Sequence, residues 1–441
     1  MTSPCSAISV WSLPASRLAK ALPWQTRRAG APGQGPPVIA MPEGQGVVVT
    51  GLGLVLPPGA GLAAADAIFQ GRSAVSLLPA IEGIPHATGA AVRNFRPTAG
   101  TETADRAIQF AVSAADEALA GAGMDRSSPS PQRIATVVSL SKGPLLALAC
   151  WAGQPRDATR FRSGISPDAA ASAIALRRGL AGPVLAPVTA CASGGHALIW
   201  GASLIARGRV DAAVVGAAEA SLHPIVIGSY LRMGVLADAG DDAACSVRPF
   251  SATRRGFAIG EGAGILVLES EASAARRGVL PLARISGWAT GSQACRMAAM
   301  EPTGEALARV MSCALARAGL VAEAVDYIHA HGTATPDNDV AEARAIRQAL
   351  GPTAGRVSVS STKGAHGHLL GAATAVELVL TVLAMQRGEV PPTANLTDPD
   401  PGIGLDCTPL VARRRPIRCA LKIASGFGGH VAAIVLTSPV S

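Results

Sequence analysis

Short apolar runs alternate with segments of helical spacing along most of this 441-residue chain, and this alternation limits the possible folds more than any other feature. The runs have the length of strands, and the segments between them carry apolar residues three and four positions apart, as one face of a helix does. Such alternation predicts an α/β fold with mostly parallel sheets between layers of helices. We expect strands over residues 47–50, 134–140, 184–188, 212–215, 265–268, 327–330, 356–360, 421–424 and 431–436, and helices over 105–119, 197–207, 304–318, 340–350 and 369–386.

Cys191 lies where one of these runs meets one of these segments. Residues 183–190 are apolar and contain β-branched side chains, which predicts a buried strand, and residues 197–207 have helical spacing. At the start of a helix, free N–H groups and the helix dipole favour the thiolate over the thiol. From its position alone, however, Cys191 is more often a small buried side chain that fills a gap in the core.

Two later segments supply histidines that change this balance. His331 begins the run HGTATP, and His368 ends the run KGAHGH. A cysteine with two such histidines has the parts of an acyl-accepting nucleophile. The histidines also form H-x-H pairs, so that a metal site using nearby aspartates is an alternative. Because residues i and i+2 of a strand point to opposite faces, we expect each pair to split, and we predict no metal.

The composition narrows the classes of partner. The net charge is +8, but aromatic residues make up only 3% of the chain, so stacking on nucleic-acid bases is a poor hypothesis and no nucleic acid is expected. Scattered arginines suit a small acidic protein better. The eight cysteines form no CxxC pair, which argues against a zinc ribbon or a disulfide framework and fits a reducing cytoplasm. The sequence contains no run of about 20 apolar residues, so we predict no membrane span.

Residues 1–42 differ in composition from the rest of the chain. They contain four basic residues and no acidic one, and Pro and Gly cluster over 30–37. No apolar core follows the charges, as a secretory signal would require. Three interpretations stay open: a translation start placed too far upstream of Met41, a disordered arm, or an organelle transit peptide. We therefore treat 1–42 as a disordered or non-native extension.

The residues around Cys191 resemble the active-site signature of the β-ketoacyl-acyl carrier protein synthases, which are condensing enzymes of the thiolase-like superfamily. Other motifs match in the family's order, and the resemblance covers roughly residues 46–438. They are VVVTGLG at 47–53, GAAE at 216–219, RPF at 248–250, GFAIGEGAG at 256–264, HGTATP at 331–336, Lys363 with His368, PPTANL at 391–396 and GFGG at 426–429. Chance does not account for so many ordered matches.

The resemblance implies a five-layered α-β-α-β-α fold of two similar halves. Residues 43–273 would form the half that carries the nucleophile, and residues 274–441 the half that carries both catalytic histidines. Members of the family are homodimers, and a heterodimer is possible. The pair of histidines resembles the elongating synthases more than the chain-initiating type or the thiolases.

The resemblance also implies the chemistry, a decarboxylative Claisen condensation between an acyl thioester on Cys191 and malonyl-acyl carrier protein. Cys191 would need a lowered pKa, and His331 and His368 would bind the malonyl thioester carbonyl. By the same resemblance, the backbone of Phe427 would contribute to an oxyanion hole, and Lys363 would pair with the buried carboxylate of Glu342. Thr333 and Thr335 would bind the phosphopantetheine arm, and Lys142 would lie at the acyl gate. No cofactor is expected beyond the phosphopantetheine of the carrier protein.

Departures from the family pattern concentrate in one pocket. Lys142 stands where an apolar gate residue is common, Ala298 where a hydroxyl is common, and Ser425 where a second Phe is common. They favour a specialised polyketide or lipid pathway over housekeeping fatty acid synthesis. The alternative function is a non-condensing chain-length partner subunit of a synthase heterodimer. Such partners characteristically lack the cysteine, so the presence of Cys191 favours an enzyme.

Overall fold

The computed structural model describes residues 45–79, 81, 84, 86–124, 129–153, 166–240 and 242–439. The predicted extension over 1–42 lies outside the described residues. The strands are β1 Val47–Leu56, β2 Gly59–Ala60, β3 Ser76–Leu77, β4 Thr88–Ala90, β5 Ile134–Leu140, β6 Val184–Leu185, β7 Ala212–Glu219, β8 Ile259–Gly260, β9 Gly262–Ser270, β10 Ala283–Ser292, β11 Tyr327–His329, β12 Ser358–Ser360, β13 Glu389–Val390, β14 Arg413–Arg414, β15 Cys419–Gly426 and β16 His430–Thr437. The helices are α1 Ala65–Phe69, α2 Arg106–Gly121, α3 Leu145–Gly153, α4 Ala169–Arg178, α5 Ser193–Ala206, α6 Pro224–Arg232, α7 Glu271–Arg276, α8 Glu305–Arg317, α9 Pro336–Leu350, α10 Lys363–His366 and α11 Ala373–Arg387.

The large sheet consists of two halves with the same topology. Its strand order is β12-β11-β15-β16-β10-β1-β9-β7-β5-β6, with β2 paired to β1. Numbered along the chain within each half, the strands of both halves run 3-2-4-5-1 from the outer edge to the centre. The halves meet where β1 pairs with β10 at three positions, Val47 to Val49 against Ala283 to Ile285. The duplication is thus a repeat of topology.

The prediction of mostly parallel sheets is wrong, because the sheet is mixed. In the first half β5 runs parallel to β6 and β7, whereas β9 runs antiparallel to both β7 and β1. In the second half β11 runs parallel to β12 and β15, whereas β16 runs antiparallel to both β15 and β10. Three residues join β15 to β16, and so short a connection allows only a hairpin, since a parallel pair needs a crossover.

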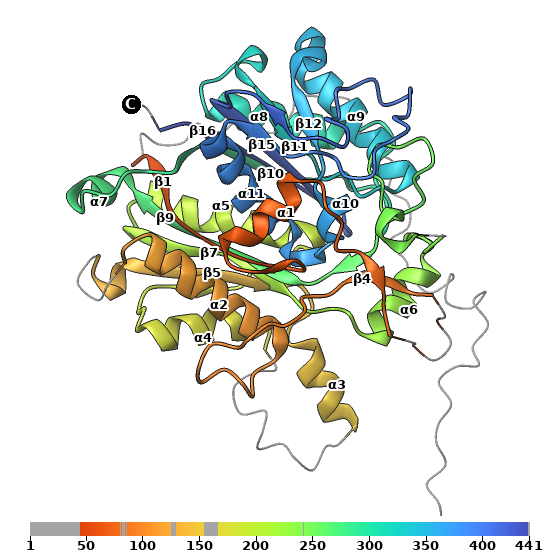
Figure 1. Ribbon diagram of the computed structural model, residues 1–441. Coiled ribbons are helices and arrows are strands. Elements are labelled where there is room, and N and C mark those ends of the chain that lie inside the picture. The colour runs from red at the N-terminus through yellow and green to blue at the C-terminus, as the bar shows by residue number, and fades with distance from the viewer. Residues whose placement is uncertain are drawn as a thin grey trace, which may run out of the picture. The chain divides into compact units, whose positions relative to one another are not determined.

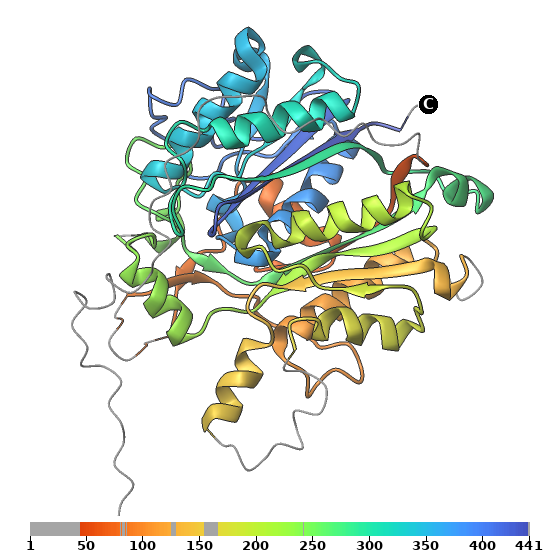
Figure 2. The same cartoon turned by 180° about the vertical axis from the view of Figure 1, so that it is seen from behind.

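The elements stack in the five layers that the family resemblance implied (Figures 1 and 2). Helices α2 and α4 pack on the outer face of the first half, and α8 and α9 cover the second half. Helices α5 and α11 pack against each other between the two halves of the sheet, where α5 contacts β5 and β7 and α11 contacts β9 and β15. This central pair carries the Cys191 turn and the segment after His368 into the middle of the molecule.

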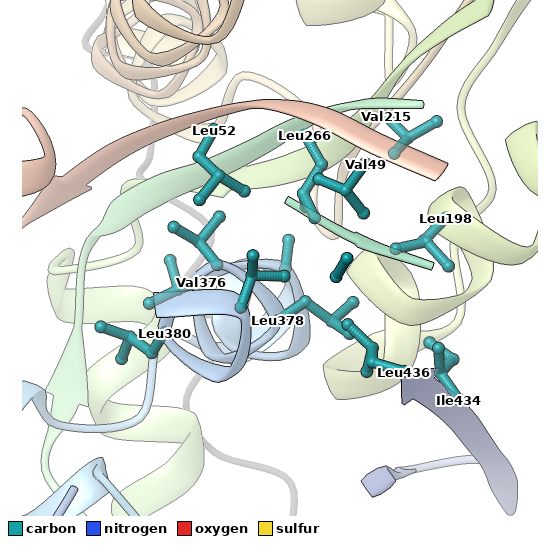
Figure 3. Packing of buried hydrophobic residues seen from close by; sticks show 14 of the residues in the cluster. Val49, Leu52, Leu198, Val215, Leu266, Val376, Leu378, Leu380, Ile434 and Leu436 are labelled. Carbon is teal, nitrogen blue, oxygen red and sulfur yellow. The ribbon is translucent and has the colours of Figure 1, made fainter. Parts of the chain in front are cut away.

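The central layer has an apolar core shared by both halves. Figure 3 shows Leu198 of α5 and Val376 and Leu378 of α11 between Leu266 of β9 and Ile434 of β16, and all five side chains are buried. A helix that is apolar on all sides is a buried helix. The helical segment 370–387 is long and apolar enough to cross a membrane by composition, but 83% of it is buried within the fold, which makes it a core element.

The buried strand predicted over 183–190 is not formed. Only Val184 and Leu185 pair, as β6 at the outer edge of the sheet, and their side chains are 38% and 37% exposed. Pro183 and Pro187 flank this pair, and proline cannot donate a hydrogen bond to a strand ladder. The two prolines therefore keep β6 short and at the edge.

Candidate active site

Cys191 lies in a tight turn at the start of α5. The turn is a 3-10 helix over Ala190–Ala192, and Ala190 has a positive φ of 49°, which is rare for a residue with a side chain. Ser193 stabilises the turn by two hydrogen bonds. Its hydroxyl accepts from Thr189 N at 2.9 Å and donates to Ala190 O at 2.7 Å. Thr374 Oγ1 of α11 donates to the Cys191 carbonyl at 3.0 Å. The nucleophile candidate is thus fixed from both central helices.

The glycine-rich hairpin after β15 approaches the Cys191 turn closely. A Cβ atom at Gly426 would lie only 2.7 Å from Thr189 O and 3.2 Å from Cys191 N, so this position accepts no side chain. Phe427 follows, and its ring stacks on Tyr230 with 6.0 Å between centroids. The backbone at 426–427 therefore lies against the N–H of Cys191.

These segments border a pocket of about 370 Å³. It brings together most of the residues singled out by the sequence, including Ala298 and Ser425, two of the three positions that depart from the family pattern. The predicted residues that line it are Cys191, Ala298, His331, Thr333, Thr335, His368, Ser425 and Phe427. Thr333 Oγ1 and Thr335 Oγ1 are 2.9 Å apart, and Pro336 and Asp337 at the same wall are exposed. The pocket thus runs from solvent to a buried cysteine.

His331 and His368 face each other deep in this pocket. Their ring centroids are 5.4 Å apart and the rings are nearly perpendicular, at 81°. Leu370 N donates to His368 Nδ1 at 3.3 Å, which leaves the ring proton on Nε2. His331 Nδ1 is buried and has no hydrogen-bond partner among the residues that the structure describes. His368 therefore presents an N–H donor to a ligand.

Both histidines are neutral. Burial, with the positive charge of Lys363 adding to it, holds the pKa of His331 and of His368 well below the usual value near 6.5. A neutral imidazole can donate one hydrogen bond without bringing a net charge into the pocket. This is the state required of a donor that binds a carbonyl oxygen.

The predicted lowering of the Cys191 pKa is wrong for the free enzyme. Burial raises the pKa of the thiol to about 11, although the charges of Lys142 and Lys363 act in the opposite direction. Only 6% of Cys191 is exposed, so desolvation of a thiolate outweighs these charges. The free protein therefore holds a thiol, and the helix N-terminus can stabilise the negative charge only as it develops.

Lys363 has a different carboxylate partner from the one predicted. Its ammonium forms a buried ion pair with Glu377 Oε1 of α11 at 2.5 Å and donates to the carbonyl of His331. Glu342, the predicted partner, instead accepts from the backbone N–H of His331 and, at 2.7 Å, from that of Gly332. The prediction is wrong because Lys363 reaches across to the central helix α11, whereas Glu342 lies in the second turn of α9 and binds the backbone of the His331 loop.

Two charged residues that the sequence reading missed complete this cluster. Glu377 interrupts the apolar run of α11, and Lys422 interrupts the apolar strand β15. Both side chains are fully buried, and they form an ion pair with 2.6 Å between Lys422 Nζ and Glu377 Oε2. A single charge inside an apolar run is the signal that could have identified each of them.

Lys142 lies directly after β5 and does not line the pocket. Its ammonium donates to Ser141 Oγ at 2.9 Å and lies 3.6 Å from Glu219 Oε1. The 3-10 turn Leu370–Ala372 packs against both the Cys191 turn and β5, and Gly371 N donates to Glu219 Oε2 at 3.0 Å. The Lys142 and Glu219 pair is therefore part of the structure that surrounds the Cys191 turn.

The two H-x-H pairs split as expected, but strand geometry is not the reason, because His329 is the last residue of β11 and His366 is the last residue of α10. His329 contacts Thr381 and Thr362 hydroxyls at 2.9 and 3.0 Å, and His366 contacts the Thr362 hydroxyl at 2.8 Å. Both rings lie in the core, away from the pocket that His331 and His368 line. Within the described ranges, no group of three or more His, Cys, Asp or Glu side chains is arranged to hold a metal ion.

The fold and this pocket define a thiolase-like condensing enzyme, and the comparisons identify its family. The model of the β-ketoacyl synthase N-terminal domain matches residues 45–274, and that of the C-terminal domain matches residues 282–397. The chain belongs to the β-ketoacyl synthase family. It is therefore an acyltransferase that performs a decarboxylative condensation of thioesters.

Named relatives come from both polyketide and fatty acid pathways. The tetracenomycin polyketide synthase ketoacyl synthase alpha subunit of Streptomyces glaucescens is 36% identical over 89% of this chain and 97% of its own length. The 3-oxoacyl-[acyl-carrier-protein] synthase 2 of Coxiella burnetii is 33% identical over 90% of this chain and 99% of its own length. Sequence identity alone therefore does not distinguish a polyketide pathway from a fatty acid pathway for this chain.

Solved structures match at the level of the whole fold. A type II polyketide ketosynthase bound to a hexaketide, in complex with its acyl-carrier protein, is 32% identical with a TM-score of 0.82 and covers 90% of this chain and 100% of that one. The ishigamide ketosynthase/chain length factor is 30% identical with a TM-score of 0.82 and the same two coverages.

Proposed function

We propose that this enzyme elongates an oxygen-bearing acyl chain held on Cys191, using malonyl-acyl carrier protein as the extender, in a polyketide or related lipid pathway. The observation that carries the proposal is the meeting of Cys191, His331, His368 and the Phe427 backbone in one pocket. Each of these groups meets one need of the reaction.

In the first half-reaction, Cys191 Sγ attacks the acyl thioester and the phosphopantetheine thiol leaves. The Cys191 proton is lost as the new C–S bond forms, because the free thiol has a pKa of about 11. The N–H groups of Cys191 and Phe427 bind the oxyanion of the tetrahedral intermediate, and the close approach of Gly426 supports this arrangement. The phosphopantetheine sulfur leaves as a thiolate and takes up the proton that Cys191 loses.

In the second half-reaction, His331 and His368 bind the thioester carbonyl of malonyl-acyl carrier protein. CO2 leaves, and the electrons of the broken C–C bond form an enolate, whose oxygen the two imidazole N–H groups stabilise. The enolate carbon then attacks the acyl group on Cys191, and the Cys191 sulfur leaves as a thiolate, which takes up a proton from solvent to restore the thiol. Neutral histidines suit this role, because they donate without protonating the enolate carbon.

Thr333 and Thr335 are proposed to bind the phosphopantetheine arm. Their hydroxyls are adjacent, at 2.9 Å, on the wall between the buried cysteine and exposed Asp337. Phosphopantetheine carries two amides, and hydroxyls can donate to or accept from either. No other cofactor is proposed, because the carrier protein brings this group with it.

Lys142 supports the polyketide class of acyl chain. Lys142 does not line the pocket, but its ammonium, paired with Glu219 and Ser141 beside the nucleophile turn, acts on Cys191 through its charge. A positive charge at this end of the site favours polar keto oxygens over an alkyl chain, which gains only from apolar contacts. The polyketide names among the relatives agree with this reading.

The carrier protein is proposed to dock near the pocket mouth, beside exposed Arg232 on α6 and exposed Arg255. An acidic helix would be attracted to these side chains, and added salt would weaken the association. The neighbouring Arg254 is buried and forms an ion pair with Asp400 at 2.6 Å. It is therefore excluded as a docking residue.

A dimer is proposed, formed by this chain with a second copy or with a chain-length factor. The edge strand β6 exposes Val184 and Leu185, and exposed Val188 and Trp200 lie nearby in the chain and on α5. An exposed apolar edge strand is a template for pairing with another chain. A cytoplasmic location is proposed along with it, because the substrates are carried by a cytoplasmic carrier protein in such pathways.

The test is to incubate the protein with malonyl-acyl carrier protein and with a panel of acyl-carrier proteins bearing alkyl or keto-substituted chains, and to score the products by mass spectrometry. We expect acylation at Cys191, CO2 release and a two-carbon extension, with keto-substituted chains preferred. Cys191→Ala should abolish acylation.

Three outcomes separate the proposals. If the wild type neither acylates Cys191 nor releases CO2 with any donor, the condensing role fails and the chain-length partner role replaces it. If alkyl chains are extended faster than keto-substituted ones, the polyketide assignment fails. Lys142→Met should shift the preference towards alkyl chains, and an unchanged preference contradicts the role of Lys142.

A further inference from the structure

The backbone that leads into His331 is held by two buried lysines. Lys363 donates to the carbonyl of His331, and Lys422 Nζ lies 2.9 Å from the carbonyl of Ala330 and 3.3 Å from that of His329. Three consecutive carbonyls at the end of β11 thus face ammonium groups. Glu342 binds the next two N–H groups from the other side.

One carboxylate serves both lysines. Glu377 lies with Oε1 2.5 Å from Lys363 Nζ and Oε2 2.6 Å from Lys422 Nζ, and all three side chains are fully buried. Burial raises the pKa of neighbouring Glu342 to about 7, so Glu377 is the carboxylate that both lysines share. Removing Lys422 would leave Glu377 Oε2 without its ion-pair partner in the core, which is costly unless the surrounding groups move.

We propose that Lys422 is a positioning residue for the decarboxylation step, which sets the position of His331 by binding the carbonyls of His329 and Ala330 while sharing Glu377 with Lys363. This inference rests on the proposed function, since it assigns a role within that site. Lys422 does not line the pocket, so it acts through the His331 backbone.

The arrangement predicts an effect on one half-reaction. Cys191 is held by α5, the Gly426 hairpin and Thr374, and none of these contacts involves Lys422. His331 depends on the end of β11, which Lys422 holds directly. Loss of Lys422 should therefore slow decarboxylation while leaving acylation of Cys191 nearly unchanged.

The charge state of Lys422 adds a second readout. Burial lowers the pKa of Lys422 to about 8, although Glu377 raises it, so the ammonium begins to lose its proton within the range of an enzyme assay. The groups that act on it come from every neighbouring element: Glu377 on α11, Lys363 on α10, Glu342 on α9 and His329 on β11. Above pH 8 the wild type should lose part of its decarboxylation rate. The rate of Lys422→Met should not show this fall.

The experiment measures two rates on the same full-length protein: acylation of Cys191 by the best acyl-carrier protein of the panel, and CO2 release from malonyl-acyl carrier protein. For Lys422→Met we expect acylation within about threefold of wild type and CO2 release slower by about 10- to 100-fold, as for a misplaced catalytic group. Ile423→Ala is the matched control, because Ile423 is the next residue of β15, is buried, and belongs to the apolar core instead of the cluster. It should reduce stability without changing the ratio of the two rates.

Each outcome is decisive. Equal loss of both rates in Lys422→Met, or no loss of CO2 release, overturns the proposal. If Lys422→Met does not fold, Lys422→Gln replaces it, since Gln keeps N–H donors for the Ala330 carbonyl but removes the charge. For Lys422→Gln, the proposal is overturned if the ratio of CO2 release to acylation equals that of the wild type and CO2 release still falls above pH 8. A wild type that performs neither reaction refutes the proposed function itself, which is a separate result.

Discussion

Cys191 is a buried thiol beside two neutral imidazoles, and this charge state differs from the thiolate that a helix start alone predicts. Desolvation decides the difference, because the side chain is 6% exposed while the nearest cations, Lys142 and Lys363, are paired with carboxylates. A carboxylate partner cancels much of the attraction that a lysine would offer a thiolate. The reactivity of Cys191 should therefore depend strongly on pH.

Alkylation of Cys191 by iodoacetamide tests this charge state. The thiolate is the reactive form, and with a pKa of about 11 its fraction rises as the pH rises towards that value. We expect the rate to increase about tenfold per pH unit between pH 7 and pH 9, as for any thiol well below its pKa. Peptide mapping by mass spectrometry separates Cys191 from exposed Cys295, which serves as the reference for the reagent. A plateau below pH 8 would contradict the raised pKa.

Single residues were the most predictable part of the site. Cys191, His331 and His368 can be identified from motifs, and the structure brings them to one pocket with Thr333, Thr335 and Phe427. The partner of Lys363 could not be identified in this way. Ion pairs are chosen by distance in space, and Glu377 and Lys422 come from a helix and a strand whose contact depends on the whole fold.

At the scale of elements, the site is made by backbone segments that approach within van der Waals contact. The Cys191 turn, the Gly426 hairpin and the segment after His368 each contain or border a residue that tolerates unusual backbone geometry. Ala190, Ala334 and Leu370 have φ of 49°, 62° and 46°, and each lies within three residues of Cys191, His331 or His368. Strained backbone of this kind persists where surrounding structure holds it, commonly at functional sites.

Gly426→Ala tests the approach of the hairpin to the nucleophile. The new methyl group would lie 2.7 Å from Thr189 O, so the end of β15 must move away from Cys191 N. We expect acylation of Cys191 to slow by about 10- to 100-fold, because the oxyanion donors separate. The protein should lose about 1–3 kcal/mol of stability, as for other overpacked sites.

The matched control is Gly291→Ala on β10, where a Cβ would also lie 2.7 Å from its nearest atom, Val310 Cγ2. It should reduce the free energy of unfolding without slowing acylation of the folded protein. Acylation rates are measured by mass spectrometry and stability by urea unfolding. Equal rates for the two variants would show that the hairpin does not contribute to the site.

Helices and strands were predictable where the period of the apolar residues is strong. Strand β5 has the bounds expected from its apolar run, and α8 and α2 differ from expectation by one or two residues at their ends. Strand β10 was missed, because Gly287, Gly291 and polar residues interrupt its pattern, and pairing with β1 and β16 forms it nonetheless. The prediction of a buried strand over 183–190 is wrong for the opposite reason: its apolar pattern is strong, but two prolines limit its pairing.

At the scale of the molecule, the repeated topology places an edge strand at each end of the sheet. β12 is covered in part by a bridge from Ser358 to Asp406, whereas β6, among the residues that the structure describes, pairs only with β5 and exposes its side chains. Exposed apolar edges are uncommon in proteins that act alone. The molecule therefore has one edge suited to association with another chain.

Leu185→Lys tests whether β6 forms a subunit interface. A charged side chain on the edge strand opposes pairing with another chain, so the mass in solution should fall from that of a dimer to that of a monomer. Leu280→Lys is the control, since Leu280 is also exposed, at 86%, but lies in the loop between α7 and the central strand β10. Light scattering after size-exclusion chromatography measures both. A dimer unchanged by Leu185→Lys would place the interface elsewhere.

The sequence by itself predicted the strongly periodic elements, because periodicity is a local property, and its ordered motifs gave the reacting groups and, through the family resemblance, the five-layered class of fold. Only the tertiary structure decided the charge state of Cys191, the pairing of Lys363 with Glu377, the role of Glu342 and the burial of Lys422 beside Glu377. Burial sets a pKa and distance sets an ion pair, and both arise when α5, α11 and β15 pack together. The mixed sheet likewise follows from which strands meet in space.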